Sequence, residues 1–335
     1  MKKPLISVIV PVLNEAAYIE AMVCSLLKQK QENVSMELLL VDGGSTDGTL
    51  EKLNVLTPQY PFINIIHNER HITPVAFNKG LAAAKGDYIA ILGAHSKYDE
   101  DYLETCIAEI QQHNVEGCSG RVIVAGNNAK GEAALVYCLL TSNFGVSSKS
   151  YRTANEGISE QCPYPVFKRC VFDKVGFYNE DLPRNQDNDM NYRIRKAGYK
   201  LYYSFKTSAC YYHPQTISGL LKYALRTGKG NAMSLKISPA SMSLRHVIPM
   251  LFTAFLLVLI CCLLFGLLLP GNIELITAVA LTSCIGIHLL CGVIQSLQFY
   301  RQLGAKDLWK LPGLFLVFHF VYGWGMLVGL MTNKR

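Results

Sequence analysis

Long apolar runs begin at Val247, after a stretch that mixes charged, polar and apolar residues. The run 247–269 has no Asp, Glu, Lys or Arg, and at roughly 1.5 Å per helical residue it can cross a hydrocarbon layer about 30 Å thick. The runs 275–294 and 311–331 also lack these four residue types, and each is close to the ~20 residues that a span needs. The sequence therefore predicts a globular part followed by about three membrane helices.

The charges that flank these runs predict their orientation. The segment 215–246 is basic and has no acidic residue, and the loop before the third run carries Arg301, Lys306 and Lys310. Both should face the cytoplasm, because positive loops stay on that side. The third run is open to two readings, since its glycines also permit a re-entrant segment and the basic residues 334–335 argue against a third full crossing.

The membrane also explains the formal net charge of +7, because a basic segment beside a span is attracted to anionic headgroups. Nucleic acid is not needed to account for this charge. No cleavable signal peptide is expected, since the chain starts with a mixed, strand-like run. The eleven cysteines have no CxxC spacing, so we expect them to be reduced and to pack as small hydrophobic residues.

Strand and helix patterns alternate in the first part of the chain. Strands are predicted over 6–11, 36–41, 63–67 and 88–92, and helices over 17–27 and 74–84, with a further helix that follows the turn 43–49 and continues through Leu53. This alternation predicts an α/β domain with a parallel sheet. Ligands of such sheets bind outside the carboxyl ends of the strands, and Asn14, Asp42 and His95 all fall there. A helix-capping role is the alternative for Asn14 and Asp42.

Four blocks in this part resemble the inverting glycosyltransferases of family 2, whose nucleotide-sugar-binding domain has the Rossmann-like GT-A fold. The blocks are 8–15 (VIVPVLNE), 41–49 (VDGGSTDGT), 78–88 (NKG through GDY) and 185–199 (NQDND through YRIRKAGY). Three further segments, 144–146, 184–187 and 319–323, look like the succinoglycan-biosynthesis-type subgroup, which joins such a domain to C-terminal membrane helices. The resemblance predicts a GT-A domain over 1–214, a basic membrane-interface segment over 215–246 and a helical transmembrane region over 247–335.

The resemblance also implies which residues bind the nucleotide-sugar donor. They are Pro11, Asn14, Glu15, Asp42, Asn78, Gly93 and His95. A carboxylate suits this pocket because it accepts hydrogen bonds from base N–H groups and ribose hydroxyls.

The chain departs from the family at the end of the fourth strand. The family has there an acidic pair that holds a divalent ion, Mn²⁺ or Mg²⁺, whereas this chain has Gly93-Ala94-His95. Glycine offers no side-chain ligand, but the His95 imidazole can bind Mn²⁺-like ions. Three outcomes are open: a metal held by His95 with the donor diphosphate and a residue such as His213, neutralisation of the diphosphate by basic side chains without metal, or a catalytically inactive homologue.

The family's acidic motif aligns with Asp187, which the resemblance implies is the general base for the acceptor hydroxyl. Capping of the helix that follows is the alternative role. On this helix Asp189 and Arg193 are spaced for an i, i+4 ion pair. Candidate acceptor- or phosphate-binding residues are Gln186, Asp189, Arg193, His213, Arg226 and Lys229. Simple anchoring to anionic lipid is an equally good reading of Arg226 and Lys229.

Taken together, the resemblance predicts a multi-pass cell-membrane enzyme with its catalytic domain in the cytoplasm. It would move a sugar from a nucleotide-diphospho-sugar to a lipid-linked saccharide, with inversion, in the synthesis of exopolysaccharide or another cell-surface glycan. The rival functions are a processive polysaccharide synthase, a polyprenyl-phosphate sugar synthase and a non-catalytic partner subunit. Three short apolar runs are few for a polymer channel, which disfavours the first of these.

Overall fold

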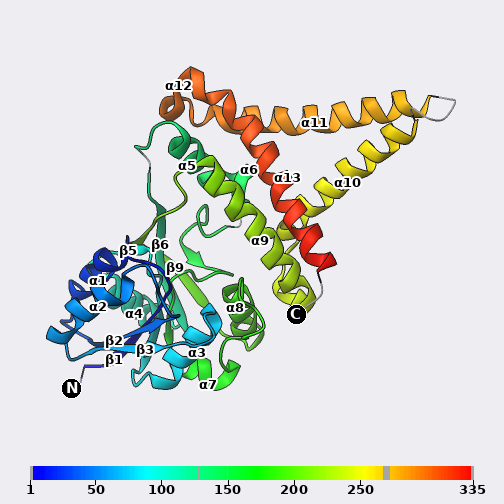
Figure 1. Ribbon diagram of the computed structural model, residues 1–335. Helices are drawn as coiled ribbons and strands as arrows, with labels where there is room; N and C mark the ends of the chain where they lie inside the picture. The colour runs from blue at the N-terminus through cyan, green and yellow to red at the C-terminus, as the bar shows by residue number, and fades with distance from the viewer. Residues whose placement is uncertain (1–2, 127, 149, 267–271, 333–335) are drawn as a thin grey trace. The chain divides into compact units, whose positions relative to one another are not determined.

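The computed structural model describes residues 3–126, 128–148, 150–266 and 272–332, and it divides into two compact units (Figure 1). The first unit contains Met1–Ile123 and Ala154–Tyr212, and the second contains Val124–Thr153 and His213–Arg335. The segment Val124–Thr153 thus belongs with the C-terminal part of the chain, which no pattern in the sequence had indicated. All eleven cysteines are free thiols, as predicted.

Within the described residues, the first unit is built on a mixed sheet. Its strands are β1 (Leu5–Val12), β2 (Ser35–Asp42), β3 (Ile63–His67), β4 (Tyr88–Ile91), β5 (Ser96–Tyr98), β6 (Gly117–Val124), β7 (Gly157–Ile158), β8 (Val166–Lys168) and β9 (Leu201–Tyr211). Its helices are α1 (Ile19–Leu27), α2 (Thr49–Leu56), α3 (Thr73–Ala83), α4 (Tyr102–Gln112), α7 (Cys170–Val175) and α8 (Gln186–Lys196), with a short 3₁₀ turn at Thr57–Gln59.

The strands lie in the order β3-β2-β1-β4-β8-β6-β9-β5, and β7 pairs with β9. The first four strands of the chain pair in parallel, as the alternation of strands and helices predicted. The later strands β8, β9, β5 and β7 pair antiparallel. The sequence analysis did not predict these later strands, several of which are only two or three residues long and too short to show a period.

Successive residues of β1 point to opposite faces of the sheet, and both faces are buried. Val8 and Val10 join one apolar cluster with α1 and α4, whereas Ile9 joins a second cluster with α3 and α8. A strand covered on both faces reads as a continuous apolar run, which is what 6–10 shows. Each such fully buried aliphatic side chain contributes about 1.5–3 kcal/mol to folding, so the sheet is a rigid base for the loops at its edge.

The second unit is helical in its described residues. Its helices are α5 (Glu132–Thr141), α6 (Asn143–Val146), α9 (Ile217–Ile237), α10 (Leu244–Gly266), α11 (Ile273–Leu297), α12 (Tyr300–Leu308) and α13 (Lys310–Met331), with a 3₁₀ turn at Pro239–Ser241. Apolar residues of α5, α9 and α13 form its core. The Thr216 hydroxyl accepts a hydrogen bond from Gly219 N (3.1 Å) and thereby caps α9.

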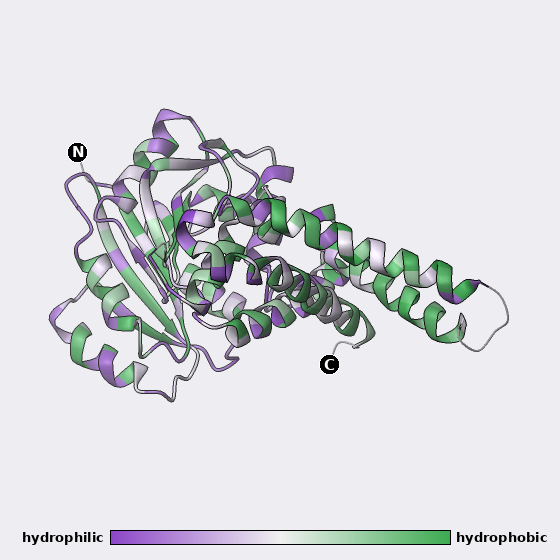
Figure 2. Cartoon of the chain, turned by 90° about the horizontal axis from the view of Figure 1, so that it is seen from above, coloured by the Kyte–Doolittle hydropathy of each residue, from purple (hydrophilic) through white to green (hydrophobic). Residues whose placement is uncertain are grey.

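Three helices of the second unit, α10, α11 and α13, are long and apolar enough to cross a membrane by length and composition. They match the predicted runs closely, although the end of the first run, 267–269, lies outside the described residues. Colouring by hydropathy shows that hydrophobic residues predominate along the long helices (Figure 2). The chain is therefore suited to association with a membrane.

Candidate active site

Asn14 follows β1 and Asp42 is the last residue of β2, and the two lie at the same edge of the sheet because Val12 pairs with Asp42. Asp42 is 1% exposed, and its carboxylate accepts hydrogen bonds from Gly44 N (2.8 Å) and from the Ser45 hydroxyl (2.6 Å). The Ser45 Oγ atom in turn accepts a hydrogen bond from Asn14 N (2.9 Å). The two predicted residues are therefore joined through Ser45, which the sequence analysis did not single out although it lies within the quoted block 41–49.

The loops after β1 and β2 are joined at two further points. The Asn14 side-chain oxygen accepts a hydrogen bond from Thr46 N (2.9 Å), and Asn14 itself has the left-handed backbone conformation (φ 55°) that asparagine tolerates. The Thr49 hydroxyl accepts a hydrogen bond from Glu15 N (2.9 Å). Neither Asn14 nor Asp42 is an N-cap, because α1 starts after Tyr18 and α2 starts after Gly48. The helix-capping alternative for these two residues is therefore wrong.

Glu15 and His95 meet at this edge of the sheet. The Glu15 Oε1 atom lies 3.2 Å from His95 Nδ1, and the two side chains are 19% and 43% exposed. The His95 ring also contacts the edge of Tyr211, since the next residue, Ser96, pairs with Tyr211 between β5 and β9. A carboxylate and an imidazole are thus held together where the first, second and fourth strands end, and both remain open to solvent.

Aromatic rings surround this pair on the side of β9. Tyr18, which the sequence analysis missed, stacks on Tyr212 with ring centroids 5.7 Å apart. A tyrosine just after a predicted turn carries no signal of its own, because its partner is almost two hundred residues away in the sequence.

Gly93 is enclosed by tyrosines. The Tyr98 hydroxyl donates to Gly93 O (3.1 Å) and accepts from Gly93 N (2.7 Å), and burial raises the pKa of Tyr98 so that it stays protonated. A Cβ atom on Gly93 would lie 3.0 Å from the Tyr164 ring. A side chain at this position would therefore crowd the Tyr164 ring, which fits the glycine found there.

The protein ligands available for a divalent metal are few. Among the described residues, no group of three or more His, Cys, Asp or Glu side chains could hold a metal ion. His95 and Glu15 supply two donor atoms, whereas hard divalent ions take six or more ligands. The suggested partner His213 is 4% exposed, and its ring nitrogens face the carbonyl oxygens of Pro214 (2.6 Å) and Ala125 (2.7 Å). The donor set does not by itself form a metal site.

Asp187 lies in the first turn of α8, two residues after the N-cap Asn185, so it does not cap the helix. Its side chain is exposed, and its Oδ1 atom accepts a hydrogen bond from Asn188 N (2.9 Å). Desolvation by the surrounding protein raises the pKa of Asp187 above the usual aspartate value, although contact with solvent limits this shift. Next to it, Gln186 has a buried side-chain oxygen without a hydrogen-bond partner among the described residues.

Arg193 holds α8 in place. Its guanidinium pairs with Asp189 at 2.9 Å, which confirms the predicted i, i+4 pair, and it donates to the carbonyl oxygens of Val175 (2.6 Å) and Phe177 (2.9 Å). With its donors engaged in this way, Arg193 fixes the segment after α7 against α8. The geometry therefore favours a positioning role for Arg193 over contact with an acceptor.

Asn78 has a similar bracing role. Its amide nitrogen donates to Tyr178 O (2.9 Å) and to Glu180 (3.0 Å), and its amide oxygen accepts from Tyr178 N (2.9 Å). The side chain thus binds a loop that lies a hundred residues further along the chain. Pro11 is half-buried in β1 and pairs with Val41.

The remaining predicted residues belong to the second unit. Arg226 and Lys229 are exposed on α9, and neither forms a salt bridge within the described part of the chain. Their free cationic groups are suited to a phosphate or to lipid headgroups.

Comparison with known proteins names a family for the N-terminal part of the chain. Residues 7–164 match the family described as Glycosyl transferase family 2. The succinoglycan biosynthesis protein ExoA of Rhizobium meliloti (strain 1021) is 28% identical over 246 residues, which covers 72% of this chain and 74% of that protein.

A second relative and a solved structure extend over nearly all of the chain. The dolichyl N-acetyl-alpha-D-glucosaminyl phosphate 3-beta-D-2,3-diacetamido-2,3-dideoxy-beta-D-glucuronosyltransferase of Methanococcus voltae is 26% identical over 338 residues and 98% of both chains. The mannosyltransferase PcManGT from Pyrobaculum calidifontis, solved in complex with GDP-Man and Mn²⁺, has a TM-score of 0.57 at 15% identity and covers 97% of this chain and 88% of its own. At that identity the likeness shows the fold alone.

Proposed function

We propose, from the premise that this chain belongs to glycosyl transferase family 2, that it transfers a sugar from a nucleotide-diphospho-sugar to a lipid-linked saccharide with inversion. The family makes the chain a glycosyltransferase. The names of two relatives support glycan synthesis, and one of them includes a dolichyl-phosphate-linked sugar. The apolar helices support an acceptor that reaches the enzyme from a membrane, with the catalytic domain on the cytoplasmic side.

The observation that carries this proposal is the joined pair of loops after β1 and β2. The hydrogen bonds through Ser45 and from Thr46 N to the Asn14 side-chain oxygen hold the two loops together. A preformed loop pair lowers the entropic cost of binding, because fewer groups must be ordered by the donor. The buried Asp42 then acts mainly by ordering the loop after β2. Asn14 is exposed and Glu15 is partly exposed, so both can contact the donor.

The chemical step needs a base and a stabilised leaving group. The Asp187 carboxylate accepts the proton of the acceptor hydroxyl while its oxygen forms a bond to the anomeric carbon. The bond from that carbon to the nucleoside diphosphate breaks on the opposite face, and the diphosphate leaves with the electron pair. One displacement of this kind inverts the anomeric centre.

Glu15 and His95 alone do not complete a coordination shell for a divalent ion. The His95 ring, at the end of the fourth strand, is the candidate contact to the donor diphosphate. In its cationic form it would offset negative charge on the leaving group.

The proposal is tested with purified full-length protein in lipid, a panel of nucleotide sugars and polyprenyl-diphosphate saccharides as acceptors. We expect release of nucleoside diphosphate that depends on the acceptor, with one donor strongly preferred. Turnover with bare polyprenyl phosphate instead of the saccharide would identify the enzyme as a polyprenyl-phosphate sugar synthase. No turnover with any donor, with or without Mn²⁺, would contradict catalysis.

A further inference from the structure

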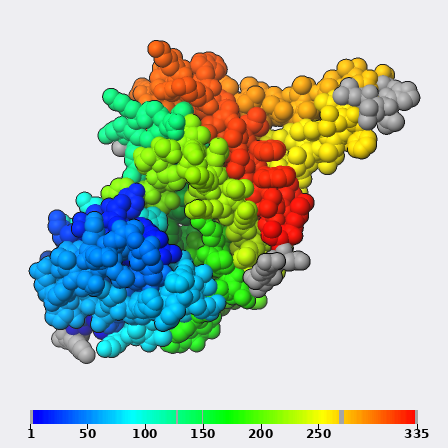
Figure 3. Space-filling view, viewed as in Figure 1, coloured from blue at the N-terminus to red at the C-terminus, as the bar shows by residue number. Residues whose placement is uncertain are grey.

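Helices α9 and α13 pack side by side and run in the same direction along nearly their whole lengths (Figures 1 and 3). Near their N-termini, Leu220 and Phe315 share one buried cluster. In the middle, a Cβ atom on Gly325 would lie 2.5 Å from the carbonyl oxygen of Leu225, so the close approach requires glycine. At the C-terminal end, the Lys236 ammonium of α9 donates to three carbonyl oxygens at the end of α13, at 2.7–3.1 Å. Whatever environment α13 occupies, α9 shares it.

The outer face of α9 is not suited to hydrocarbon. Lys222, Arg226 and Lys229 are exposed and, at spacings of four and three residues, lie on one face of the helix, which has no acidic residue. A single charged side chain at the centre of a bilayer costs about 2.5–3.5 kcal/mol even on the most permissive scale. If α13 crossed the bilayer, α9 would carry these cations across with it.

The position of α13 on the α10–α11 hairpin gives a second argument. The hairpin helices are antiparallel, with Gly266 against Glu274 at one end of the pair and Phe252 stacked on His288 further along. The contacts of α13 lie on the side away from the linking segment, where its Pro312 packs against Gly292 of α11.

From there α13 runs toward the start of α10. The Thr253 hydroxyl of α10 donates to Phe320 O (3.2 Å), and the last turn of α13 lies beside Lys236, eight residues before α10 begins at Leu244. Helix α13 (red in Figure 1) thus passes between the unlinked ends of α10 and α11. Both ends of α13 therefore lie near the unlinked end of the hairpin. A helix that crossed the bilayer beside α10 and α11 would instead extend from one end of the hairpin to the other.

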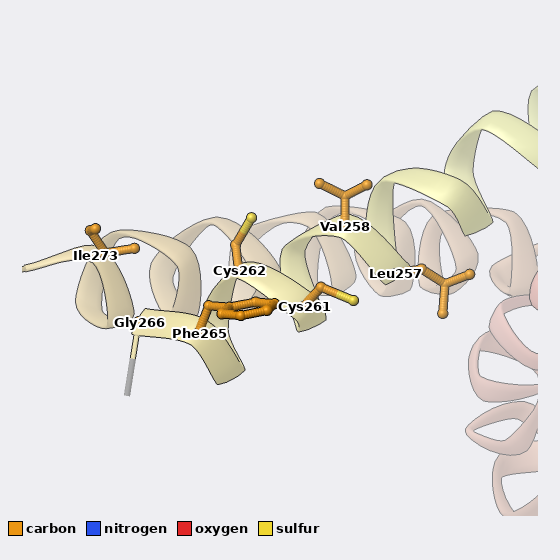
Figure 4. A pocket seen from close by; sticks show the side chains of 7 residues that line it. All are labelled: Leu257, Val258, Cys261, Cys262, Phe265, Gly266 and Ile273. Atoms are coloured by element: carbon orange, nitrogen blue, oxygen red, sulfur yellow. The ribbon is translucent and has the colours of Figure 1, made fainter. Parts of the chain in front are cut away.

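The part of the hairpin near the linking segment has the surface that a crossing needs. An open hollow there is lined by apolar side chains and thiols, among them Leu257, Val258 and Phe265 of α10 and Ile273 of α11 (Figure 4). Such a surface meets lipid without cost.

We propose that the α10–α11 hairpin crosses the bilayer and that α13 lies along the membrane surface with α9, so that the helix pair docks on anionic lipid. The exposed apolar residues of α13 support this arrangement. Val317, Trp324 and Met331 are 45%, 44% and 81% exposed and are spaced by seven residues, which puts them on one face. This face enters the acyl chains of one leaflet, and the cations of α9 meet headgroup phosphates. The inference is independent of sugar transfer.

The two tryptophans of the chain, Trp309 and Trp324, allow a direct test. They are fifteen residues apart along α13, so about 22 Å of helix separates them. In a crossing helix that starts at one surface, Trp324 would lie beyond the midplane of a hydrocarbon core about 30 Å thick. In the proposed arrangement both rings are at similar, shallow depths.

The measurement uses the full-length Trp309→Phe variant in vesicles that contain phosphatidylglycerol and lipids brominated at defined positions of the acyl chain. We expect bromine near the headgroup to cause a larger loss of Trp324 fluorescence than bromine near the methyl end. The Trp324→Phe variant, which reports Trp309, should give the same order. Trp324 fluorescence that is quenched most by deep bromine, or by neither lipid, would overturn the proposal.

The sidedness of the chain ends gives an independent outcome. Protease-cleavable tags at the N-terminus and after Arg335 should both be cleaved, or both be protected, in sealed vesicles of one orientation, because two crossings return the chain to its starting side. Cleavage of only one tag requires an odd number of crossings and contradicts the proposal. Neither measurement depends on enzymatic activity, so failure of the sugar-transfer proposal would leave this one standing.

Discussion

The reactivity proposed for this site depends on the environment of one carboxylate. Asp187 is exposed enough to meet an acceptor hydroxyl, yet the protein around it raises its pKa above the ordinary aspartate value. A higher pKa makes the carboxylate a stronger base.

Replacement of Asp187 by Asn should lower kcat by about 10²–10⁴-fold, which is the usual contribution of a general base, and leave donor binding unchanged. In the unchanged enzyme the rate should fall as the pH drops through the raised pKa, because protonated Asp187 cannot accept the proton. The pH–rate profile measures this acid limb, which the Asn variant should lack. Full activity of Asp187→Asn would exclude the proposed base.

Ser45 offers a second residue-scale test. The Ser45→Ala change removes the hydroxyl that joins Asp42 to Asn14 N, so the loops become less ordered. The loss of about 1 kcal/mol per hydrogen bond predicts a rise of roughly 5- to 30-fold in the KM for the donor, with a smaller effect on kcat. The neighbouring exposed Thr46→Ala change keeps the backbone N–H that Asn14 uses and should be silent. Equal effects of the two changes would show that the Ser45 bridge does not order the donor site.

At the scale of elements, the site depends on helices that are held by side chains from distant segments. Arg193 ties α8 to the end of α7 and to the residues just after it. Asn78 ties α3 to the loop that follows α7. These braces determine where Asp187 lies, since it is in the first turn of α8.

Arg193→Ala should destabilise the first unit by about 2–4 kcal/mol, because it removes the ion pair with the buried Asp189 carboxylate and the hydrogen bonds to two carbonyl oxygens. The matched change Arg195→Ala removes an exposed cation from the same helix and should have little effect. Thermal unfolding of both variants in the same detergent measures the difference. A similar Tm for the two would contradict the bracing role of Arg193.

The contact between α9 and α13 makes opposite predictions for two glycines of α13. Gly325→Ala should lower the Tm, because the added Cβ would clash with the Leu225 carbonyl, whereas a Cβ on Gly313 meets nothing within 4 Å. Gly313→Ala should therefore be neutral or stabilise by up to about 1 kcal/mol through helix propensity. Thermal unfolding monitored on the full-length protein distinguishes the signs, and stabilisation by both changes would show that the helices do not pack this closely.

Considered as a whole, the chain joins a mixed α/β unit to a helical unit that contains three long apolar helices. This arrangement suits a reaction with a water-soluble donor and a lipid-linked acceptor. The exposed cations Lys222, Arg226 and Lys229 are the residues through which the lipid environment could affect turnover.

The triple change of these cations to Gln should raise the KM for a polyprenyl-diphosphate acceptor by about tenfold and leave the KM for a short, water-soluble analogue of it unchanged. Each basic residue near an anionic surface contributes about 1 kcal/mol of electrostatic attraction. The acceptor diphosphate loses part of this attraction when the three cations are replaced. High salt should reduce the difference between the two proteins, since it screens these charges. A triple change of exposed cations of the first unit, Lys28, Arg195 and Lys196, serves as the control. Equal KM values for the lipid acceptor would exclude this role.

The parallel half of the sheet, the three long apolar helices and the resemblance to glycosyl transferase family 2 were all predictable from the amino-acid sequence. These features depend on local patterns, such as buried strands, apolar runs of fixed length and compact motifs like 41–49, which do not require knowledge of distant contacts. The sequence also predicted the Asp189–Arg193 pair, because both residues lie on one helix.

Contacts between residues far apart in the chain were not predictable from the sequence and are seen only in the folded protein. The tertiary structure joined Glu15 to His95, placed Tyr164 against Gly93 and committed Asn78 to a loop a hundred residues away. It also brought 124–153 into the second unit and laid α9 along α13, which the apolar pattern of 311–331 could not reveal. The physical reason is that hydrophobic periodicity reports that a side chain is covered, whereas packing and hydrogen-bond geometry decide which part of the chain covers it.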